Sequence, residues 1–155
     1  MPPSELRIAL YQPDIPGNAG TILRLAACLG LVVDIVGQAG FDLADRALRR
    51  AGMDYLEMAA LARHVDFAAF EAAVLPGRRL VLLTTRADLP YTDFAFAPTD
   101  VLLFGRESAG VPEIVHQRAE ARLLIPMPGG GRSLNVALAV AMAVGEALRQ
   151  CGRQA

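Results

Sequence analysis

Lysine is absent from this chain of 155 residues, and all fifteen basic residues are arginine. A Walker-type phosphate loop needs a lysine on the phosphates of its nucleotide, so this absence excludes that class of nucleotide hydrolase. Tryptophan is also absent, and aromatic residues make up only 6% of the chain. Because 54% of the residues are nevertheless hydrophobic, the composition indicates a globular protein and excludes a disordered or fibrous one.

Cysteine and histidine are scarce, with two of each. Cys28 and Cys151 lie far apart without CxxC spacing, and His64 and His116 are the only histidines. These four residues do not have the spacing of a zinc site, so we expect no metal.

Long apolar runs and an excess of basic charge are also missing. The longest apolar run, residues 136–144, is about half of the roughly 20 residues that a membrane-spanning helix needs. Residues 1–5 have neither the basic start nor the apolar stretch of a secretory signal peptide, so we expect a cytoplasmic protein without a membrane anchor. The formal net charge of −1 leaves a local basic patch as the route to a nucleic acid.

Strand and helix signals alternate along the chain. Apolar runs predict strands at 6–11, 31–36, 80–84, 101–104 and 122–125, with an extended piece around Tyr55. Helical spacing predicts helices over 18–29, 43–51, 67–75 and 133–150, with a short helix opened by Pro112. The alternation favours the α/β class, a mostly parallel sheet flanked by helices, in a single domain covering residues 1–155.

Loops that follow the predicted strands are the candidates for function, because open parallel sheets bind ligands at the carboxyl ends of their strands. The first such loop, residues 13–20, leads into a helix that carries Arg24. Asn18 can cap this helix, and Arg24 lies a turn and a half further on, so both could face a ligand. A capped helix with a solvated arginine is the alternative interpretation.

The second loop, residues 104–112, contains two glycines that let the backbone approach a ligand, and Glu107 offers a carboxylate there. Its GxxSxG string is not the GxSxG nucleophile elbow, so it does not favour a hydrolase with Ser108 as nucleophile. An ordinary turn closed by Pro112 is the alternative.

The third loop, residues 125–135, has two prolines at its entry and three glycines in its middle. Ser133 and Asn135 open the last helix, where a buried Asn135 amide would need a hydrogen-bond partner. A flexible connector is the alternative. None of the three loops has the GxGxxG pattern, which argues against a nicotinamide enzyme.

In chain order, the three loops resemble the three motifs of the SPOUT RNA methyltransferases. The matching strings are Asn18–Arg24, Leu103–Pro112 and Ile125–Asn135. The similarity spans nearly the whole chain and is closest to the minimal members that methylate the ribose of the tRNA wobble nucleotide, which Leu10–Pro16 and Arg49–Tyr55 also resemble.

The resemblance implies a sheet whose C-terminal part is threaded into a deep trefoil knot, and a homodimer in which the first motif of one subunit completes the site of the other. It implies S-adenosylmethionine as the cofactor, S-adenosylhomocysteine as the product and no metal. The implied reaction is transfer of a methyl group to the ribose 2′-hydroxyl of a cytidine or modified uridine at the wobble position of tRNA.

The resemblance also assigns residues. Those implied around the cofactor are Leu83, Gly105, Ile125, Ser133 and Leu134, and those implied around the reacting groups are Asn18, Arg24, Glu107, Ser133 and Asn135. Arg24 has the critical role, either accepting the proton or positioning a phosphate beside it. Ala137, Leu138 and Gly145 depart from the family pattern and leave the substrate preference open.

The residues expected to contact RNA lie in the middle of the chain. Arg46, Arg49 and Arg50 form a basic cluster on the second predicted helix and are predicted to contact the anticodon stem-loop, while Tyr55 could stack on a base. A solvated helix face and a half-buried tyrosine are the alternative interpretations. Two other functions stay open: ribose methylation of ribosomal RNA, and a dimeric RNA-binding scaffold without catalysis.

The last predicted helix is polar only at Asn135 within residues 134–144, so it is apolar on every face. We expect a partner subunit to cover it, with Val140 and Val144 at the interface. The side of the first helix that carries residues 25, 26 and 29 is expected to pack against it at this interface, which would bring Arg24 of one chain towards Ser133 of the other.

Overall fold

The structure is a computed structural model that describes residues 5–40 and 60–152. The predicted helix over residues 43–51 and the extended piece around Tyr55 lie outside the described residues. The same holds for Arg46, Arg49 and Arg50, so their predicted contacts with RNA stay predictions.

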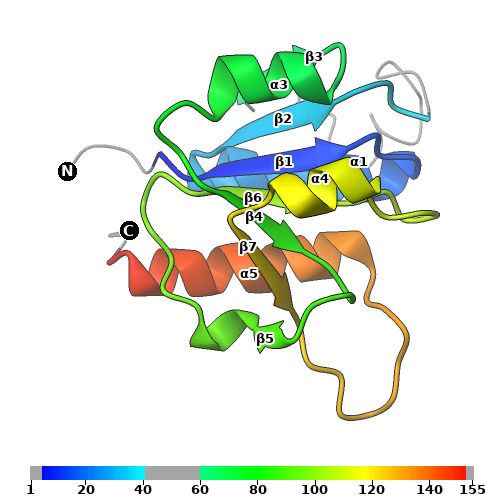
Figure 1. Ribbon diagram of the computed structural model, residues 1–155, viewed down its shortest axis with the longest axis vertical. Helices are drawn as coiled ribbons and strands as arrows, with labels where there is room; N and C mark the ends of the chain where they lie inside the picture. The colour runs from blue at the N-terminus through cyan, green and yellow to red at the C-terminus, as the bar shows by residue number, and fades with distance from the viewer. Residues whose placement is uncertain (1–4, 41–59, 153–155) are drawn as a thin grey trace.

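The described strands form one sheet in which every pairing is parallel (Figure 1). They are β1 (Arg7–Tyr11), β2 (Val32–Val36), β3 (Ala60–His64), β4 (Leu80–Leu83), β5 (Leu89–Pro90), β6 (Val101–Phe104) and β7 (Ala121–Leu124). Their order across the sheet is β3-β2-β1-β6-β4-β7-β5. The predicted α/β class with a parallel sheet is confirmed, whereas the deep trefoil knot stays a prediction.

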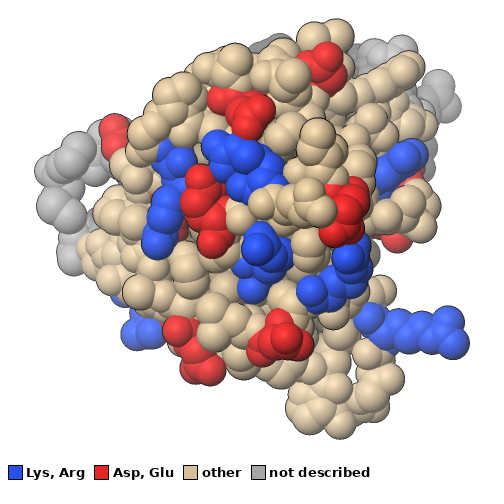
Figure 2. Space-filling view, in the orientation of Figure 1, with Lys and Arg blue, Asp and Glu red and all other residues tan. Residues whose placement is uncertain are grey.

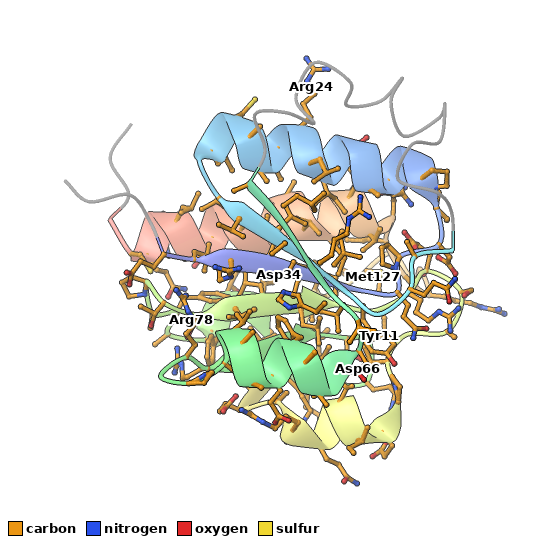
Figure 3. The ribbon with its side chains drawn as sticks, turned by 90° about the horizontal axis from the view of Figure 1, so that it is seen from above. Tyr11, Arg24, Asp34, Asp66, Arg78 and Met127 are labelled. Carbon is orange, nitrogen blue, oxygen red and sulfur yellow. The ribbon has the colours of Figure 1, made fainter. Side chains whose placement is uncertain are left out.

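Helices cover both faces of the sheet. They are α1 (Pro16–Leu29), α3 (Phe67–Val74), α4 (Glu113–Arg118) and α5 (Val136–Gln150), with a 3-10 turn η1 at Tyr91–Asp93. Figure 3 shows α1 and α5 on one side of the sheet and α3 and α4 on the other. Successive residues of a strand point to opposite faces of the sheet and belong to two different hydrophobic cores. Leu102 and Phe104 of β6 lie in the core under α1 and α5, while Val101 and Leu103 lie in the core on the other face of the sheet. This double burial explains why the central strands are continuous apolar runs.

Three predictions about helix starts are wrong. Helix α1 begins at Pro16 with Ile15 at its N-cap position, so Asn18 lies inside the first turn and does not cap the helix. Helix α5 begins at Val136 rather than at Ser133, because the Asn135 side chain accepts hydrogen bonds from the backbone N–H groups of the first turn. Pro112 is the N-cap of α4 and not its first residue.

Helix α5 buries one side within its own chain. Val140 is 0% exposed and Val144 lies in the same core, which α1 shares, so the prediction that these two valines form a subunit interface is wrong. Ala26 of α1 is buried in that core too, so this side of α1 packs against α5 of its own chain, and the prediction that it packs across the subunit interface is wrong. The uncovered side of α5 carries Leu138, 59% exposed, and Met142, 42% exposed, one turn apart. A helix that is apolar all round can bury only part of its surface against one sheet.

The strand order gathers the loops that matter for function. Strand β6 lies between β1 and β4, and β7 lies on the other side of β4. The carboxyl ends of these four parallel strands therefore meet at one edge of the sheet. Within the described residues, no helix is long and apolar enough to cross a lipid bilayer.

Candidate active site

A cavity of about 440 Å³ opens at the carboxyl edge of the sheet. The loops after β1, β4, β6 and β7 all contribute to its wall, as the sequence predicts. The residues expected around the cofactor, which are Leu83, Gly105, Ile125, Ser133 and Leu134, all line this cavity. Asn18, Glu107 and Asn135 line it as well, so residues from all three motifs meet in one place.

Two glycines shape the loop after β6. A Cβ atom on Gly105 would lie 2.8 Å from the backbone of Gly110, and Gly110 itself has a positive φ of 66°. The backbones of Arg106 and Gly110 exchange hydrogen bonds of 3.1 Å and 2.9 Å across this tight turn. Only glycine fits this approach, and the turn fixes where the backbones of Arg106 and Glu107 enter the cavity wall.

A chain of hydrogen bonds joins the three loops. The Asn135 Nδ2 donates to Asn18 Oδ1 over 2.9 Å, and Asn18 Nδ2 donates to Glu107 Oε1 over 3.4 Å. The other oxygen of Glu107 accepts from the backbone N–H of Asp14 at 3.2 Å, and the Asp14 carboxylate accepts from the Ser108 hydroxyl. Asn135 is exposed rather than buried, yet its amide still has a partner on both sides. Asp14 is a site residue that the sequence patterns do not single out.

The two carboxyl groups of the site titrate as a pair. Burial raises the pKa of Glu107, and the neighbouring Asp14 side chain raises it further. The pKa of Asp14 is lowered, first through the hydrogen bond with the Glu107 carboxyl group. These opposite directions mean that Glu107 takes up a proton before Asp14 does as the pH falls. The buried Asp14 Oδ1 has no hydrogen-bond partner among the described residues.

Arg24 does not face this cavity. Figure 3 shows its side chain projecting from α1 on the side away from the sheet. Asn18 and Arg24 are six positions apart on the helix, which turns their directions about 240° apart. The expectation that both face one ligand is therefore wrong within a single chain.

The face that carries α3 and α4 bears charges of both signs in contact (Figure 2). Arg118 of α4 pairs with Glu71 of α3, and Arg86 pairs with Glu113 of α4. This described surface is not the single-sign area expected of a nucleic-acid interface. The described residues also contain no group of His, Cys, Asp and Glu side chains that could hold a metal ion.

A family model described as the SpoU rRNA Methylase family matches residues 5–145. The tRNA (cytidine(34)-2'-O)-methyltransferase of Beijerinckia indica subsp. indica is 63% identical over 146 residues, which are 94% of this chain and 91% of the relative. A solved structure described as giving structural insights into the 2-OH methylation of C/U34 on tRNA superposes with a TM-score of 0.90. The two chains share 45% identity, and the likeness covers 94% of this chain and 95% of that one.

A second solved structure, an AdoMet-bound rRNA methyltransferase from Sinorhizobium meliloti, superposes with a TM-score of 0.85 at 29% identity. The likeness covers 93% of this chain and 56% of that one. The resemblance inferred from the three loops is thus confirmed, and the chain belongs to the SpoU rRNA methylase family.

Proposed function

We propose that this chain transfers a methyl group from S-adenosylmethionine to the ribose 2′-hydroxyl of the wobble nucleotide of tRNA, a cytidine or modified uridine at position 34. The observation that carries the proposal is the cavity built from all three motif loops, which Asn18, Glu107 and Asn135 join by hydrogen bonds. The relative at 63% identity, a tRNA (cytidine(34)-2'-O)-methyltransferase, supports position 34 as the target. Residues 1–155 act as one catalytic domain in this proposal.

The cavity fits S-adenosylmethionine. Its volume of about 440 Å³ suits a ligand of that size, and Leu83, Ile125 and Leu134 offer apolar surface to the adenine ring. Gly105 lies in the cavity wall, where its backbone groups can hydrogen-bond polar atoms of the ligand. The bound cofactor supplies an activated methyl group on a sulfonium centre. The related AdoMet-bound methyltransferase supports this assignment.

The protein's part is to place the ribose oxygen and to help its hydroxyl lose a proton. Asn18, Glu107, Ser133 and Asn135 lie on the wall of the cavity, where they position the nucleotide. Arg24 serves the proton step, either by accepting the proton or by holding a phosphate beside it. A guanidinium is a poor base in ordinary surroundings, which favours the positioning role.

We propose that the working form is a homodimer in which Arg24 of one subunit reaches the cavity of the other. Two observations support this. Arg24 projects away from the sheet of its own chain (Figure 3). Leu134, Leu138 and Met142, spaced four residues apart, leave an apolar stripe uncovered along α5 and its entry. A second copy that covered this stripe would also bring an α1 helix near the cavity, since α1 packs against α5.

With tRNA as its substrate, we place the enzyme in the cytoplasm.

Mapping methylated riboses in tRNA from cells with and without the gene tests the proposal. The 2′-O-methyl group at nucleotide 34 is expected to vanish without the gene and to return with the wild-type chain but not with Arg24→Ala. Loss of a ribose methyl group from ribosomal RNA instead would favour the alternative substrate. No change in any RNA, together with undiminished RNA binding, would favour a scaffold without catalysis, an interpretation that the departures at Ala137, Leu138 and Gly145 leave open.

A further inference from the structure

One guanidinium nitrogen of Arg106 is buried but makes no hydrogen bond within the described residues. Its Nε is shut off from water and has no hydrogen-bond partner among the described residues, although the residue as a whole is only half-buried. Arg106 lines the cavity, and Arg106 and Glu107 are the charged residues in its described wall. An enclosed N–H without an acceptor is uncommon, which points to a ligand that supplies one.

The position of Arg106 is fixed at its backbone. Its N–H and C=O both bond to Gly110 across the tight turn, and Gly105 on its other side tolerates no Cβ. The side chain therefore starts from a rigid point in the cavity wall. A planar guanidinium held this way is suited to a two-point contact with a carboxylate or phosphate.

The chemistry of the proposed substrate identifies such an anion. In RNA the 2′-hydroxyl and the 3′-phosphate stand on adjacent carbons of one ribose, so a nucleotide that presents its 2′-hydroxyl in the cavity brings its 3′-phosphodiester to the same wall. We propose that Arg106 binds the phosphodiester on the 3′ side of the methylated nucleotide and so sets the position of the ribose. This inference rests on the proposed function and names one contact within it.

The carboxylate of the cofactor is the other anion to consider, and the structure favours it less. In the cofactor, this carboxylate and an ammonium group are attached to the same α-carbon. A site for the carboxylate therefore also needs a hydrogen-bond acceptor for the ammonium group, close to the arginine. The adjacent acid is Glu107, but its two oxygens already accept from Asn18 and from the Asp14 backbone. A phosphodiester needs no such acceptor.

A double-mutant cycle between protein and RNA tests the contact. The enzymes are wild type and Arg106→Gln, and the substrates are a ligated tRNA with an ordinary phosphodiester 3′ of nucleotide 34 and one with a neutral methylphosphonate there. We expect Arg106→Gln to lower kcat/KM on ordinary tRNA about 10- to 100-fold, and the methylphosphonate to lower the wild-type value similarly. On the methylphosphonate tRNA the two enzymes should differ by less than about 3-fold, because the neutral linkage has already removed the interaction that the substitution would remove.

The matched control is Arg149→Gln, an exposed arginine of α5 paired with Glu146 and absent from the cavity wall. Arg149→Gln should leave kcat/KM nearly unchanged on both substrates. Binding of S-adenosylhomocysteine and of 5′-methylthioadenosine, which lacks the carboxylate, is measured by calorimetry for each variant. Both affinities should stay within about 2-fold of wild type in Arg106→Gln, which also shows that the variant is folded.

Three results would overturn the inference. The first is a full effect of Arg106→Gln on the methylphosphonate tRNA, and the second is no effect of it on either tRNA. The third is weaker binding of S-adenosylhomocysteine but not of 5′-methylthioadenosine, which would assign Arg106 to the cofactor. In these three cases wild-type methyl transfer is intact and the proposed function stands, whereas a wild-type chain that methylates no tRNA would remove both.

Discussion

The Asn135 side chain donates a hydrogen bond of 2.9 Å to the Asn18 side chain, a residue 117 positions earlier in the chain. The oxygen of the same Asn135 amide caps α5, and the nitrogen of the same Asn18 amide bonds to Glu107. The first turn of α1, the start of α5 and the loop after β6 are therefore coupled through two amides. A substitution at either amide should therefore shift the cavity wall in all three segments.

Asn18→Ala removes both hydrogen bonds of the Asn18 amide. Because Asn135 and Glu107 are each left without a partner there, we expect the affinity for S-adenosylhomocysteine to fall about 10-fold and the free energy of unfolding to drop by about 1 kcal/mol. Calorimetry and denaturant unfolding measure the two effects. Thr21→Ala on the same helix, which removes only an exposed bond to the Gly17 carbonyl, is the control. Equal affinities for the two variants would show that the amide chain does not shape the cavity.

Asp14→Asn should change how stability depends on pH. The raised pKa of Glu107 means that the folded chain holds its proton more tightly, so this contribution is present below its ordinary pKa of 4.5 and lost as pH rises through the raised value. The lowered pKa of Asp14 acts in the opposite sense: its contribution is present above the ordinary 3.8 and lost as pH falls through the lowered value.

Without the Asp14 carboxylate, the pKa of Glu107 moves back toward its ordinary value, although burial still raises it. We therefore expect the loss of stability above pH 4.5 to occur at lower pH in Asp14→Asn than in wild type. Thermal unfolding between about pH 4 and 8 measures this, with Asp66→Asn at the cap of α3 as a control outside the cavity. Superimposable pH profiles for wild type and Asp14→Asn would show that Asp14 does not raise the pKa of Glu107.

Much of the fold is predictable because the central strands are buried on both faces. Residues 101–104 form four consecutive apolar positions, and the strand has those bounds in the structure. Strand β3 at residues 60–64 is not predicted, since it is half-exposed at the edge of the sheet and carries no regular alternation. The hydrophobic pattern of a strand reflects how much of it is buried, and a strand at the edge of a sheet is buried too little to show a clear pattern.

The candidate site is predictable as a set of loops but not as a set of contacts. Asn18 and Glu107 stand out on separate loops, yet their hydrogen bond spans 89 positions and depends on which strands are neighbours. Within a single chain, the prediction that Arg24 faces the same ligand as Asn18 is wrong because six positions of helix turn the two side chains about 240° apart. The motif analysis does not single out Arg106, although a charged residue between Gly105 and Glu107 at the end of a strand is a signal that could have found it.

Two substitutions on α5 distinguish the role of its exposed side in dimer formation from the role of its buried side in the hydrophobic core. Leu138 is exposed and Val140 is fully buried, two residues apart on the same helix. We expect Leu138→Glu to keep the free energy of monomer unfolding within about 0.5 kcal/mol but to give monomers without methyl transfer. Val140→Glu buries an unpaired charge and should cost about 3 kcal/mol or more. Sedimentation equilibrium gives the oligomeric state, and an active Leu138→Glu monomer would contradict the dimer.

The basic cluster at Arg46, Arg49 and Arg50 can be tested through salt. If Arg49 and Arg50 bind phosphates, the double variant Arg49→Ala with Arg50→Ala should reduce the slope of log Kd for tRNA against log salt by about 2, since each phosphate neutralised accounts for about 0.9 of the slope. Filter binding across salt concentrations measures the slope. The control is Arg149→Gln, which should leave it unchanged. Two parallel lines for the wild-type chain and the double variant would place the RNA surface elsewhere.

The most direct test of the proposed activity is transfer of labelled methyl from S-adenosylmethionine to two versions of one tRNA, assembled with cytidine or with 2′-deoxycytidine at nucleotide 34. The purified chain should label the first version, at ribose 34 only, and leave the second unlabelled because the accepting oxygen is gone. Label on the deoxycytidine version, or on neither version while S-adenosylmethionine is bound, would contradict ribose methylation at that nucleotide.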